Sequence, residues 1–189
     1  TGLANKALVA TRLITAMQEV HESGGMVGVL LIDLDRFKQV NDSFGHSLGD
    51  KHLRQAAERL TYLARQDDCV ARTGGDEFVM LYPGLRSAED AEPLLERVME
   101  AISQPIAIGD YVFNMTCSVG VSIYPDHAQE IDSLLTCADS ALYSAKNAGK
   151  NKVQMFSGVL AQQLGERNEI EYGLGHALQE LAWHAGTQS

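Results

Sequence analysis

The sequence predicts one mixed domain of helices and strands, α/β or α+β, over residues 1–156. Residues 26–32 are almost unbroken in apolar side chains and rich in Val and Ile, which is typical of a strand buried on both faces. Segments with helical and strand periodicity alternate around this run. The composition agrees, because 45% hydrophobic and 21% charged residues in a 189-residue chain suffice for a sizeable core.

In the first half of the chain, apolar spacing and turn residues define the elements. Asn5 could cap the first helix, and Ser23-Gly24-Gly25 would end it. Residues 36–46 are mixed and give no clear element, whereas Thr73–Glu77 has the Gly and Asp of a hairpin turn. The expected helices span residues 5–21 and 48–64, and the expected strands span 26–32, 69–72 and 78–82.

The second half follows the same rules. Ser87-x-x-Asp90 has the pattern of a capping box before a helix that Pro105 stops. Apolar and small polar residues alternate over 117–123, and Gly149 is a natural helix stop. The expected helices are 91–102 and 131–147, and the expected strands are 106–108, 111–113, 117–123 and 153–156.

After residue 156 the character of the chain changes. Glycines interrupt a weakly amphipathic stretch, and we predict a linker helix over 157–189 that leaves the domain. The chain starts abruptly, so we expect it to be a piece of a longer protein that could carry a membrane anchor elsewhere. Within this segment we expect no membrane contact, because no apolar run reaches the ~18–20 residues of a span.

Charge and cysteine content narrow the function. Fifteen basic and 25 acidic residues give a net charge of −10, which disfavours nucleic-acid binding. An anionic substrate would then need a metal ion or a local basic cluster. Cys69, Cys117 and Cys137 form no CxxC pair, and we expect reduced thiols in a cytoplasmic protein.

Two acidic motifs could carry chemistry. Asp33-Leu34-Asp35 follows a buried strand, where carboxylates and a carbonyl can hold Mg²⁺, although a solvated strand end is the commoner explanation. In Thr73–Phe78, two glycines would let a nucleotide approach and two acids would add metal ligands. An ordinary exposed hairpin turn explains that segment equally well.

The second motif also carries a resemblance. Gly74-Gly75-Asp76-Glu77-Phe78 spells GGDEF, the signature of the diguanylate cyclases. Other segments resemble that family in the correct order: Thr1–Lys6 (its TGLPNR), Asp33–Lys38 (DLDxFK), Asn41–Asp50 (NDxxGHxxGD), Ser118–Pro125 (SxGxxxxP) and Ala138–Asn151 (ADxALYxAKxxGRN). The resemblance covers about residues 1–156.

The resemblance implies an activity and a fold. The family condenses two GTP into cyclic di-GMP and pyrophosphate, with Mg²⁺ or Mn²⁺ as cofactor. Its domain resembles the palm of nucleotide cyclases and polymerases, with a central, mostly antiparallel five-stranded sheet flanked by helices. Each domain holds one GTP, so a homodimer is needed for catalysis.

The resemblance also assigns roles at the two acidic motifs. Asp33, Asp76 and Glu77 would bind the metals, assisted by the Leu34 carbonyl. Asp76 or Glu77 would help to take the proton from the 3′-hydroxyl, and Lys38 would stabilise charge on the phosphates. Gly74 and Gly75 would lie against the nucleotide.

Further substrate contacts follow in the same way. Lys146 and Lys150 would hold the terminal phosphates, and Phe37 would pack near the nucleotide. Asn41 and Asp50 would bind guanine, whose N1–H and N2–H₂ donors suit a carboxylate. Ser47-x-x-Asp50 also satisfies a capping box, which is the simpler reading of Asp50 on its own.

Arg65-Gln66-Asp67-Asp68 is an RxxD motif five residues before the GGDEF signature. In this family an RxxD at that spacing is the product-inhibition site, so Arg65 and Asp68 would bind cyclic di-GMP, with Arg97 as a further contact. As plain sequence, the motif is an exposed helix end whose charge pairs contribute little.

The departures from the family pattern are small. Ala4 and Lys6 replace Pro and Arg, and Lys150 replaces an Arg whose planar fork it lacks. All acidic signature residues are present, which favours the enzyme over a catalytically weak GTP- or cyclic di-GMP-binding regulatory module of an EAL phosphodiesterase. Residues 166–178 resemble the linker into such a domain. A plain interaction domain is the remaining alternative.

Overall fold

The computed structural model describes residues 3, 6–108, 111–160 and 162. The chain divides into two compact units, Thr1–Phe156 and Ser157–Ser189. The predicted linker helix over 157–189 lies almost wholly outside the described residues, as do Asn5 and the Gly109-Asp110 turn. All that follows concerns the first unit.

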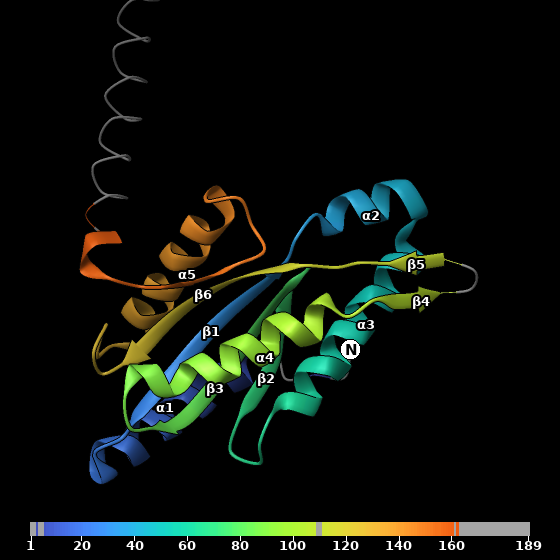
Figure 1. The fold of residues 1–189 in the computed structure, drawn as a ribbon. Coiled ribbons are helices and arrows are strands. Elements are labelled where there is room, and N and C mark those ends of the chain that lie inside the picture. Colours follow the sequence, from blue (N-terminus) through green and yellow to red (C-terminus); the bar gives the residue numbers. More distant parts are fainter. Residues whose placement is uncertain (1–2, 4–5, 109–110, 161, 163–189) are drawn as a thin grey trace, which may run out of the picture. The chain divides into compact units, whose positions relative to one another are not determined.

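A five-stranded sheet in the order β2-β3-β1-β6-β7 forms the centre of this unit (Figure 1). Only the β6–β7 pair is parallel. The mostly antiparallel sheet inferred from the family resemblance is therefore confirmed, and a separate β4–β5 hairpin accompanies it. The strands are β1 Met26–Leu34, β2 Cys69–Gly74, β3 Glu77–Leu85, β4 Ile106–Ile108, β5 Tyr111–Phe113, β6 Cys117–Tyr124 and β7 Val153–Met155.

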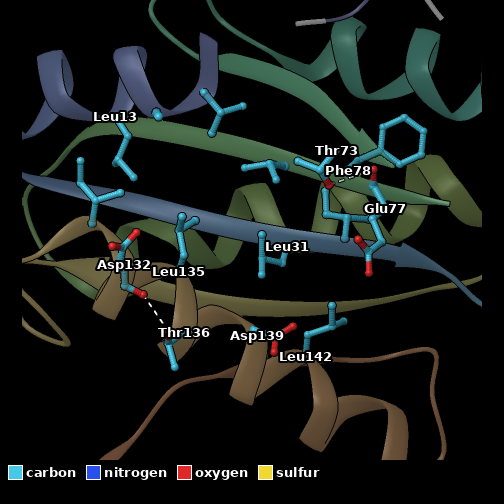
Figure 2. A pocket seen from close by; sticks show the side chains of 15 residues that line it. Leu13, Leu31, Thr73, Glu77, Phe78, Asp132, Leu135, Thr136, Asp139 and Leu142 are labelled. Carbon is cyan, nitrogen blue, oxygen red and sulfur yellow. Dashed lines mark hydrogen bonds between the residues drawn. The ribbon is translucent and has the colours of Figure 1, made fainter. Parts of the chain in front are cut away.

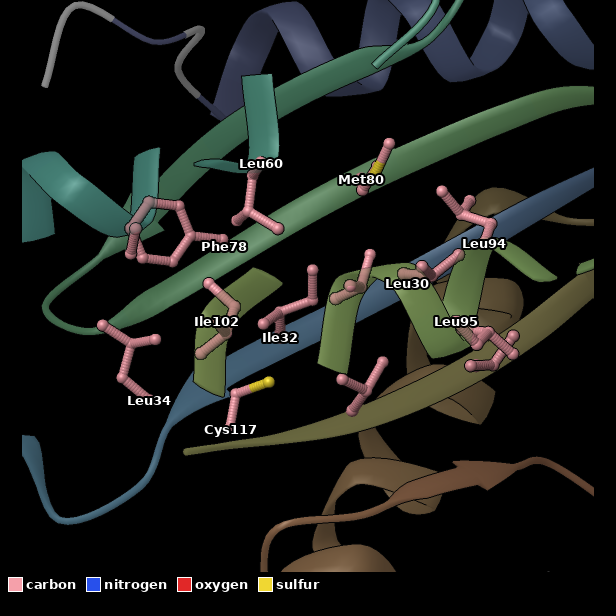
Figure 3. Packing of buried hydrophobic residues seen from close by; sticks show 14 of the residues in the cluster. Leu30, Ile32, Leu34, Leu60, Phe78, Met80, Leu94, Leu95, Ile102 and Cys117 are labelled. Atoms are coloured by element: carbon pink, nitrogen blue, oxygen red, sulfur yellow. The ribbon is translucent and has the colours of Figure 1, made fainter. Parts of the chain in front are cut away.

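Helices cover both faces of the sheet. Leu60 of α3 and Ile102 of α4 pack on one face, in the cluster that Figure 3 shows around Phe78 and Met80. Leu13 of α1 and Leu134 of α5 belong to the cluster on the other face. The helices are α1 Lys6–Ser23, α2 Phe37–Phe44, α3 His46–Leu63, α4 Glu92–Ser103 and α5 Ile131–Asn147.

Burial on both faces explains the unbroken apolar sequence of β1. Leu30, Ile32 and Leu34 face the α3 and α4 side, whereas Val27 and Val29 belong to the opposite cluster. Strand β6 is likewise buried along nearly its whole length. At Gly120 of β6, a Cβ atom would overlap the Ala138 carbonyl oxygen of α5. Glycine is thus required where α5 crosses the sheet.

Three local expectations were wrong. Residues 37–44 form α2, an amphipathic helix without a fully buried residue, so the segment lacks a clear core pattern. Helix α3 begins at His46 with Gly45 as its N-cap, and Ser47 and Asp50 form no capping box. Asp90 accepts a hydrogen bond from the Arg86 backbone N–H, not from Ser87, and a short 3₁₀ turn precedes α4.

The three cysteines are free, as expected. Cys117 is buried, and burial raises the pKa of its thiol to about 12. Burial also raises the pKa values of Cys69 and Cys137. Such thiols are poor nucleophiles near neutral pH, so the structure gives them a packing role.

Candidate active site

Strand register brings the two acidic motifs together at one edge of the sheet. Asp33 of β1 lies directly opposite Glu77 of β3, and side chains of such a pair point to the same face. The Leu34 backbone N–H donates to the Asp76 carbonyl oxygen at 3.2 Å, which ties the β2–β3 turn to the end of β1. We call Asp33, Asp76 and Glu77, together with Lys146, the acidic edge.

The β2–β3 turn is shaped by its glycines. Gly75 has a φ of +43°, a conformation that side chains disfavour, and the position beside Gly74 is open space. The Arg72 side chain donates from Nε to the Gly75 carbonyl oxygen at 2.9 Å and so braces the turn. The turn thus has open space beside its backbone, and the contact of Gly74 and Gly75 with a nucleotide stays a prediction.

Asp33 is the most buried member of the acidic edge, with 8% of its surface exposed. Lys146 of α5 donates from Nζ to Asp33 Oδ2 at 2.7 Å. Burial raises the Asp33 pKa above its ordinary value, and the nearby Asp76 and Glu77 charges raise it further, whereas Lys146 opposes the shift. The Asp33 carboxylate therefore lies near two like charges, and a bound cation would reduce the repulsion between them.

The acidic edge fits a hard divalent cation in its residue types and electrostatics. Carboxylate and carbonyl oxygens are the ligands that Mg²⁺ prefers, and Asp33 already interacts unfavourably with Asp76 and Glu77. Among the described residues, no three His, Cys, Asp or Glu side chains are already arranged as a metal-binding group.

A groove of about 440 Å³ adjoins the acidic edge on the α1 and α5 side of the sheet. Figure 2 shows Glu77 and Thr73 near one end of this groove, with Leu13, Leu31 and Leu135 along its apolar wall. Leu31 and Glu77 come from β1 and β3, and Leu135 from α5. Glu77 therefore faces the same side of the sheet as α5, which carries Lys146.

Helices α2 and α3 hold the residues predicted to bind a base. Asn41 Oδ1 is buried and has no hydrogen-bond partner among the residues that the structure describes. It lies so close to Gly49 of α3 that a Cβ atom there would overlap it, and the same Cβ would come within 3.1 Å of Phe37 Cζ. Gly49 thus lets Phe37 and Asn41 pack against α3 immediately before the exposed Asp50.

The other two lysines predicted to bind phosphate groups, Lys38 and Lys150, are exposed. Lys38 is in the first turn of α2, and Lys150 is in the α5–β7 loop with a φ of +63°. Within the described residues, the recorded ion pairs are Arg86–Asp90 and Lys146–Asp33, so neither lysine pairs with the acidic edge. Lys146 contacts Asp33, and its predicted role in binding phosphates stays a prediction.

The RxxD residues form a second charged cluster, which we call the Arg65 patch: Arg65, Asp68 and Arg97. The Arg65 backbone N–H donates to Asp68 Oδ2 at 2.7 Å, and the Arg65 guanidinium lies 4.7 Å from the centre of the Tyr82 ring. Burial raises the pKa of Asp68, whereas the positive charges of Arg65 and Arg97 lower it. The three predicted residues are therefore neighbours.

Comparison with known proteins agrees with this geometry. The family model described as "Diguanylate cyclase, GGDEF domain" matches residues 1–152. The chain belongs to the GGDEF diguanylate cyclase family. The acidic edge is thus built from the motif that gives this family its name, together with the DLD segment and an α5 lysine.

Relatives of this GGDEF domain come from bacterial signalling proteins. The bifunctional diguanylate cyclase/cyclic di-GMP phosphodiesterase MucR of Pseudomonas aeruginosa is 37% identical over 179 residues, which are 95% of this chain and 26% of MucR. The diguanylate cyclase TpbB of the same organism is 35% identical over 172 residues, which are 90% of this chain and 40% of TpbB. The chain therefore spans about a quarter of one relative and two fifths of the other.

Solved structures of GGDEF domains have the same fold. The TpbB domain superposes with a TM-score of 0.84 at 34% identity, covering 87% of this chain and 96% of that one. The GGDEF domain of DgcB from Caulobacter crescentus, solved in complex with c-di-GMP, gives a TM-score of 0.74 at 30% identity, covering 82% and 92%. In the described part of this chain, no helix has the length and apolarity needed to cross a bilayer.

Reasoning from the sequence overlooked the partners of Asp35. This buried carboxylate accepts hydrogen bonds from Thr116 Oγ1 at 2.8 Å, Ser118 Oγ at 2.7 Å and the Asn151 backbone N–H at 3.0 Å. The available signal was the pair of hydroxyl residues at alternate positions, Thr116 and Ser118, at the start of the strand. Their side chains point the same way, toward a polar partner.

Proposed function

We propose that this GGDEF domain is a diguanylate cyclase that condenses two GTP molecules into cyclic di-GMP and two pyrophosphates. The observation that carries the proposal is the strand register that sets Asp33 opposite Glu77, with Asp76 in the adjoining turn and Lys146 on Asp33. All acidic residues of the family signature are present at this edge. The family match supports the same reaction class.

The acidic edge would hold Mg²⁺ or Mn²⁺ through Asp33, Asp76, Glu77 and the Leu34 carbonyl oxygen. The bound cation would supply positive charge that polarises the α-phosphate and lowers the pKa of the 3′-hydroxyl. Asp76 or Glu77 would accept the hydroxyl proton. Lys146, released from Asp33 once that charge is otherwise balanced, would bind the terminal phosphates together with Lys150, while Lys38 stabilises the developing charge.

Guanine would bind beside α2 and α3. The unpartnered Asn41 Oδ1 can accept a hydrogen bond from a base, and Asp50 can accept the paired N1–H and N2–H₂ donors of guanine. Adenine offers no such pair of donors, so this site would select GTP over ATP. Phe37 would pack on the nucleotide, and the backbone of Gly74 and Gly75 would approach it closely.

The reaction would require two domains facing each other, each with one GTP. The 3′-oxygen of one nucleotide attacks the α-phosphorus of the other, the α–β bridging P–O bond breaks, and pyrophosphate leaves. The same step repeated in the opposite direction closes the ring and releases the second pyrophosphate. A homodimer is therefore the proposed catalytic unit, acting in the cytoplasm, where GTP is present.

We further propose that the Arg65 patch binds cyclic di-GMP and inhibits the enzyme. An Arg guanidinium can donate two hydrogen bonds to guanine O6 and N7 or to a phosphate, and Asp68 can accept from a guanine edge. Arg97 adds positive charge beside Asp68. The patch, unlike the acidic edge, needs no metal to receive an anion.

A regulatory module that binds GTP or cyclic di-GMP without catalysis is the second candidate. The specific observation that favours it is the relationship to MucR, whose name includes a phosphodiesterase activity and of which the chain spans 26%. In that case the acidic edge would bind GTP and change the activity of an attached domain.

The products of GTP turnover separate the two candidates. The purified chain is incubated with GTP and MgCl₂, and the nucleotides are separated by chromatography. A cyclase yields cyclic di-GMP and twice as much pyrophosphate, and Asp33→Ala abolishes both. Binding of GTP without product, at every protein concentration and with two chains joined artificially, would refute the cyclase and favour the regulatory module.

A further inference from the structure

A polar cavity of about 560 Å³ lies between α2, the start of β6 and the α5–β7 loop. Arg36, Lys150 and Asn151 line it, and these are the non-glycine residues with positive φ among those described, at +59°, +63° and +46°. Left-handed backbone at such residues is unfavourable and persists only where surrounding contacts impose it. Something must therefore hold the segments that carry Arg36 and Lys150 in place.

Asp35 makes the contacts that can impose this conformation. Its carboxylate accepts from the Asn151 N–H at 3.0 Å, one residue after Lys150. It also accepts from Thr116 Oγ1 and Ser118 Oγ, while its own N–H donates to the Thr116 carbonyl oxygen at 2.8 Å. With 9% of its surface exposed, Asp35 joins the end of β1, the start of β6 and the α5–β7 loop.

The joined segments carry groups with different tasks in the proposed reaction. Asp33, two residues before Asp35, belongs to the acidic edge. Lys146 and Lys150 come from the end of α5 and the loop that follows it. Among the described residues, the Asn151–Asp35 hydrogen bond is the one direct hydrogen bond between that loop and the end of β1, apart from the Lys146–Asp33 contact.

We propose that Asp35 is a positioning residue, which fixes the Lys150 loop against the end of β1 and so sets these lysines for a triphosphate. Asp35 touches neither the metal nor the nucleotide in this account, which rests on the proposed function. Three groups converge on the Asp35 carboxylate, and one of them, the Asn151 N–H, can only donate. An Asn at this position would keep the side-chain shape but lose the negative charge, and hydrogen bonds to a neutral amide oxygen are weaker than those to a carboxylate.

Nucleotide binding measured by calorimetry on the whole chain tests the proposal. The ligands are guanosine 5′-[α,β-methylene]triphosphate, whose α–β linkage resists cleavage, and GMP, each with MgCl₂. Asp35→Asn should lower the affinity for the triphosphate analogue about tenfold or more, which is the range typical of residues that orient ligand groups. The affinity for GMP should stay unchanged. Asp126→Asn, an exposed aspartate in the turn after β6, is the matched control and should change neither affinity.

A double-mutant cycle shows whether Asp35 acts through Lys150. Lys150→Ala should lower the affinity for the triphosphate analogue in the wild-type chain. In the Asp35→Asn background the same substitution should cause little further loss of affinity. Thr116→Val, which keeps the side-chain shape and removes one donor to Asp35, should have the same effect as Asp35→Asn in smaller measure, even if Asp35→Asn folds poorly.

The outcomes separate the two proposals. Unchanged triphosphate affinity in Asp35→Asn and Thr116→Val, or additive effects in the cycle, would overturn the positioning role alone. Equal losses for the triphosphate and GMP would mean a general structural role and would overturn it as well. A wild-type chain that binds neither nucleotide would overturn the proposed function, and the positioning role with it.

Discussion

The acidic edge and the Arg65 patch lie at opposite ends of β2 and differ in how their charges are balanced. In the Arg65 patch, Asp68 accepts from the Arg65 N–H and lies near two guanidinium groups. In the acidic edge, Asp33 lies near two further carboxylates and one lysine. Asp68 precedes β2 and Gly75 follows it, and the six residues between span about 20 Å at about 3.3 Å each.

This difference indicates what each region can receive. Burial raises the pKa of both Asp33 and Asp68, and in each case the nearest basic residue, Lys146 or Arg65, lowers it. The two sites differ in their further neighbours, because Asp33 has two more carboxylates nearby whereas Asp68 has one carboxylate and a second guanidinium, that of Arg97. We expect added cations to stabilise the acidic edge, in keeping with its proposed role in binding metal and triphosphate. The Arg65 patch already has its cations and can receive a guanine base or a phosphate directly. Variants should therefore affect the two regions independently.

The largest expected effect is the loss of catalysis when a carboxylate of the acidic edge is removed. Glu77→Ala should lower the rate of cyclic di-GMP formation by at least ~100-fold, since even residues that only support metal ligands often cost 10–100-fold. Cyclic di-GMP binding at the Arg65 patch, measured by calorimetry, should be unchanged. Glu100→Ala on α4, an exposed position, is the control. Loss of product binding in Glu77→Ala would contradict the separation of the two regions.

The converse variant tests the Arg65 patch. Arg65→Ala should raise the cyclic di-GMP concentration for half-inhibition about tenfold or more, because a bidentate guanidinium–guanine contact is worth about 1–3 kcal/mol. The rate without added product should stay as in the wild type, as it should in the control Arg86→Ala, whose side chain is 92% exposed. An unchanged concentration for half-inhibition in Arg65→Ala would contradict the proposed role of the Arg65 patch.

A third variant asks whether base recognition belongs with the acidic edge. Gly49→Ala should displace Asn41, whose side chain can move, and should weaken GTP binding about tenfold while the domain still folds. Gly120→Ala is the matched control, because its Cβ would meet backbone atoms of α5 and should instead destabilise the fold by about 1–3 kcal/mol.

Binding isotherms and thermal melting of both variants distinguish these cases. Equal GTP affinity in Gly49→Ala and the wild type would show that Asn41 does not contact the base. A GTP-specific loss in Gly120→Ala, without a lower melting temperature, would contradict its structural role.

The smallest expected effect is on stability and follows from the raised pKa of Asp33. The folded chain holds this proton to higher pH than the unfolded chain, so stability falls as the pH rises from about 3.8 through the raised pKa. At pH 7 without metal, Asp33→Asn should therefore melt slightly above the wild type, and the gap should close below that window.

Asp68→Asn provides the comparison, because burial also raises the Asp68 pKa. At pH 7, Asp68→Asn should therefore also melt slightly above the wild type. Adding MgCl₂ should narrow the difference from the wild type only for Asp33→Asn, whose wild-type carboxylate would bind the ion. Scanning calorimetry at several pH values measures both effects. An Asp33→Asn chain that melts below the wild type at pH 7 would contradict the assigned electrostatics.

The sequence predicted the sheet and its long helices because buried elements have strong apolar periodicity. The 131–147 helix was predicted to the residue. Helix α2 was missed because it buries no residue fully, and a capping box was wrongly expected at Ser47 because Gly45 already starts α3. Local patterns do not show which of two nearby residues, here Gly45 or Ser47, begins a helix.

For the site, the sequence predicted which residues matter but not which of them are in contact. The motifs identified Asp33, Asp76 and Glu77, and strand register brings them to one edge, a relation that no single motif states. The placement of Lys146 on Asp33 and the three donors to Asp35 join residues more than 80 positions apart. Such long-range contacts leave no local periodic signal, and only the fold reveals them.

The most direct test of the proposed cyclase is the initial rate of cyclic di-GMP formation as a function of protein concentration, at saturating GTP and MgCl₂. Two domains must meet, each with its own GTP, so the account predicts a rate that rises more steeply than linearly and becomes linear once dimers predominate. A rate strictly proportional to protein from the lowest concentration, by a chain shown to be monomeric, would contradict it.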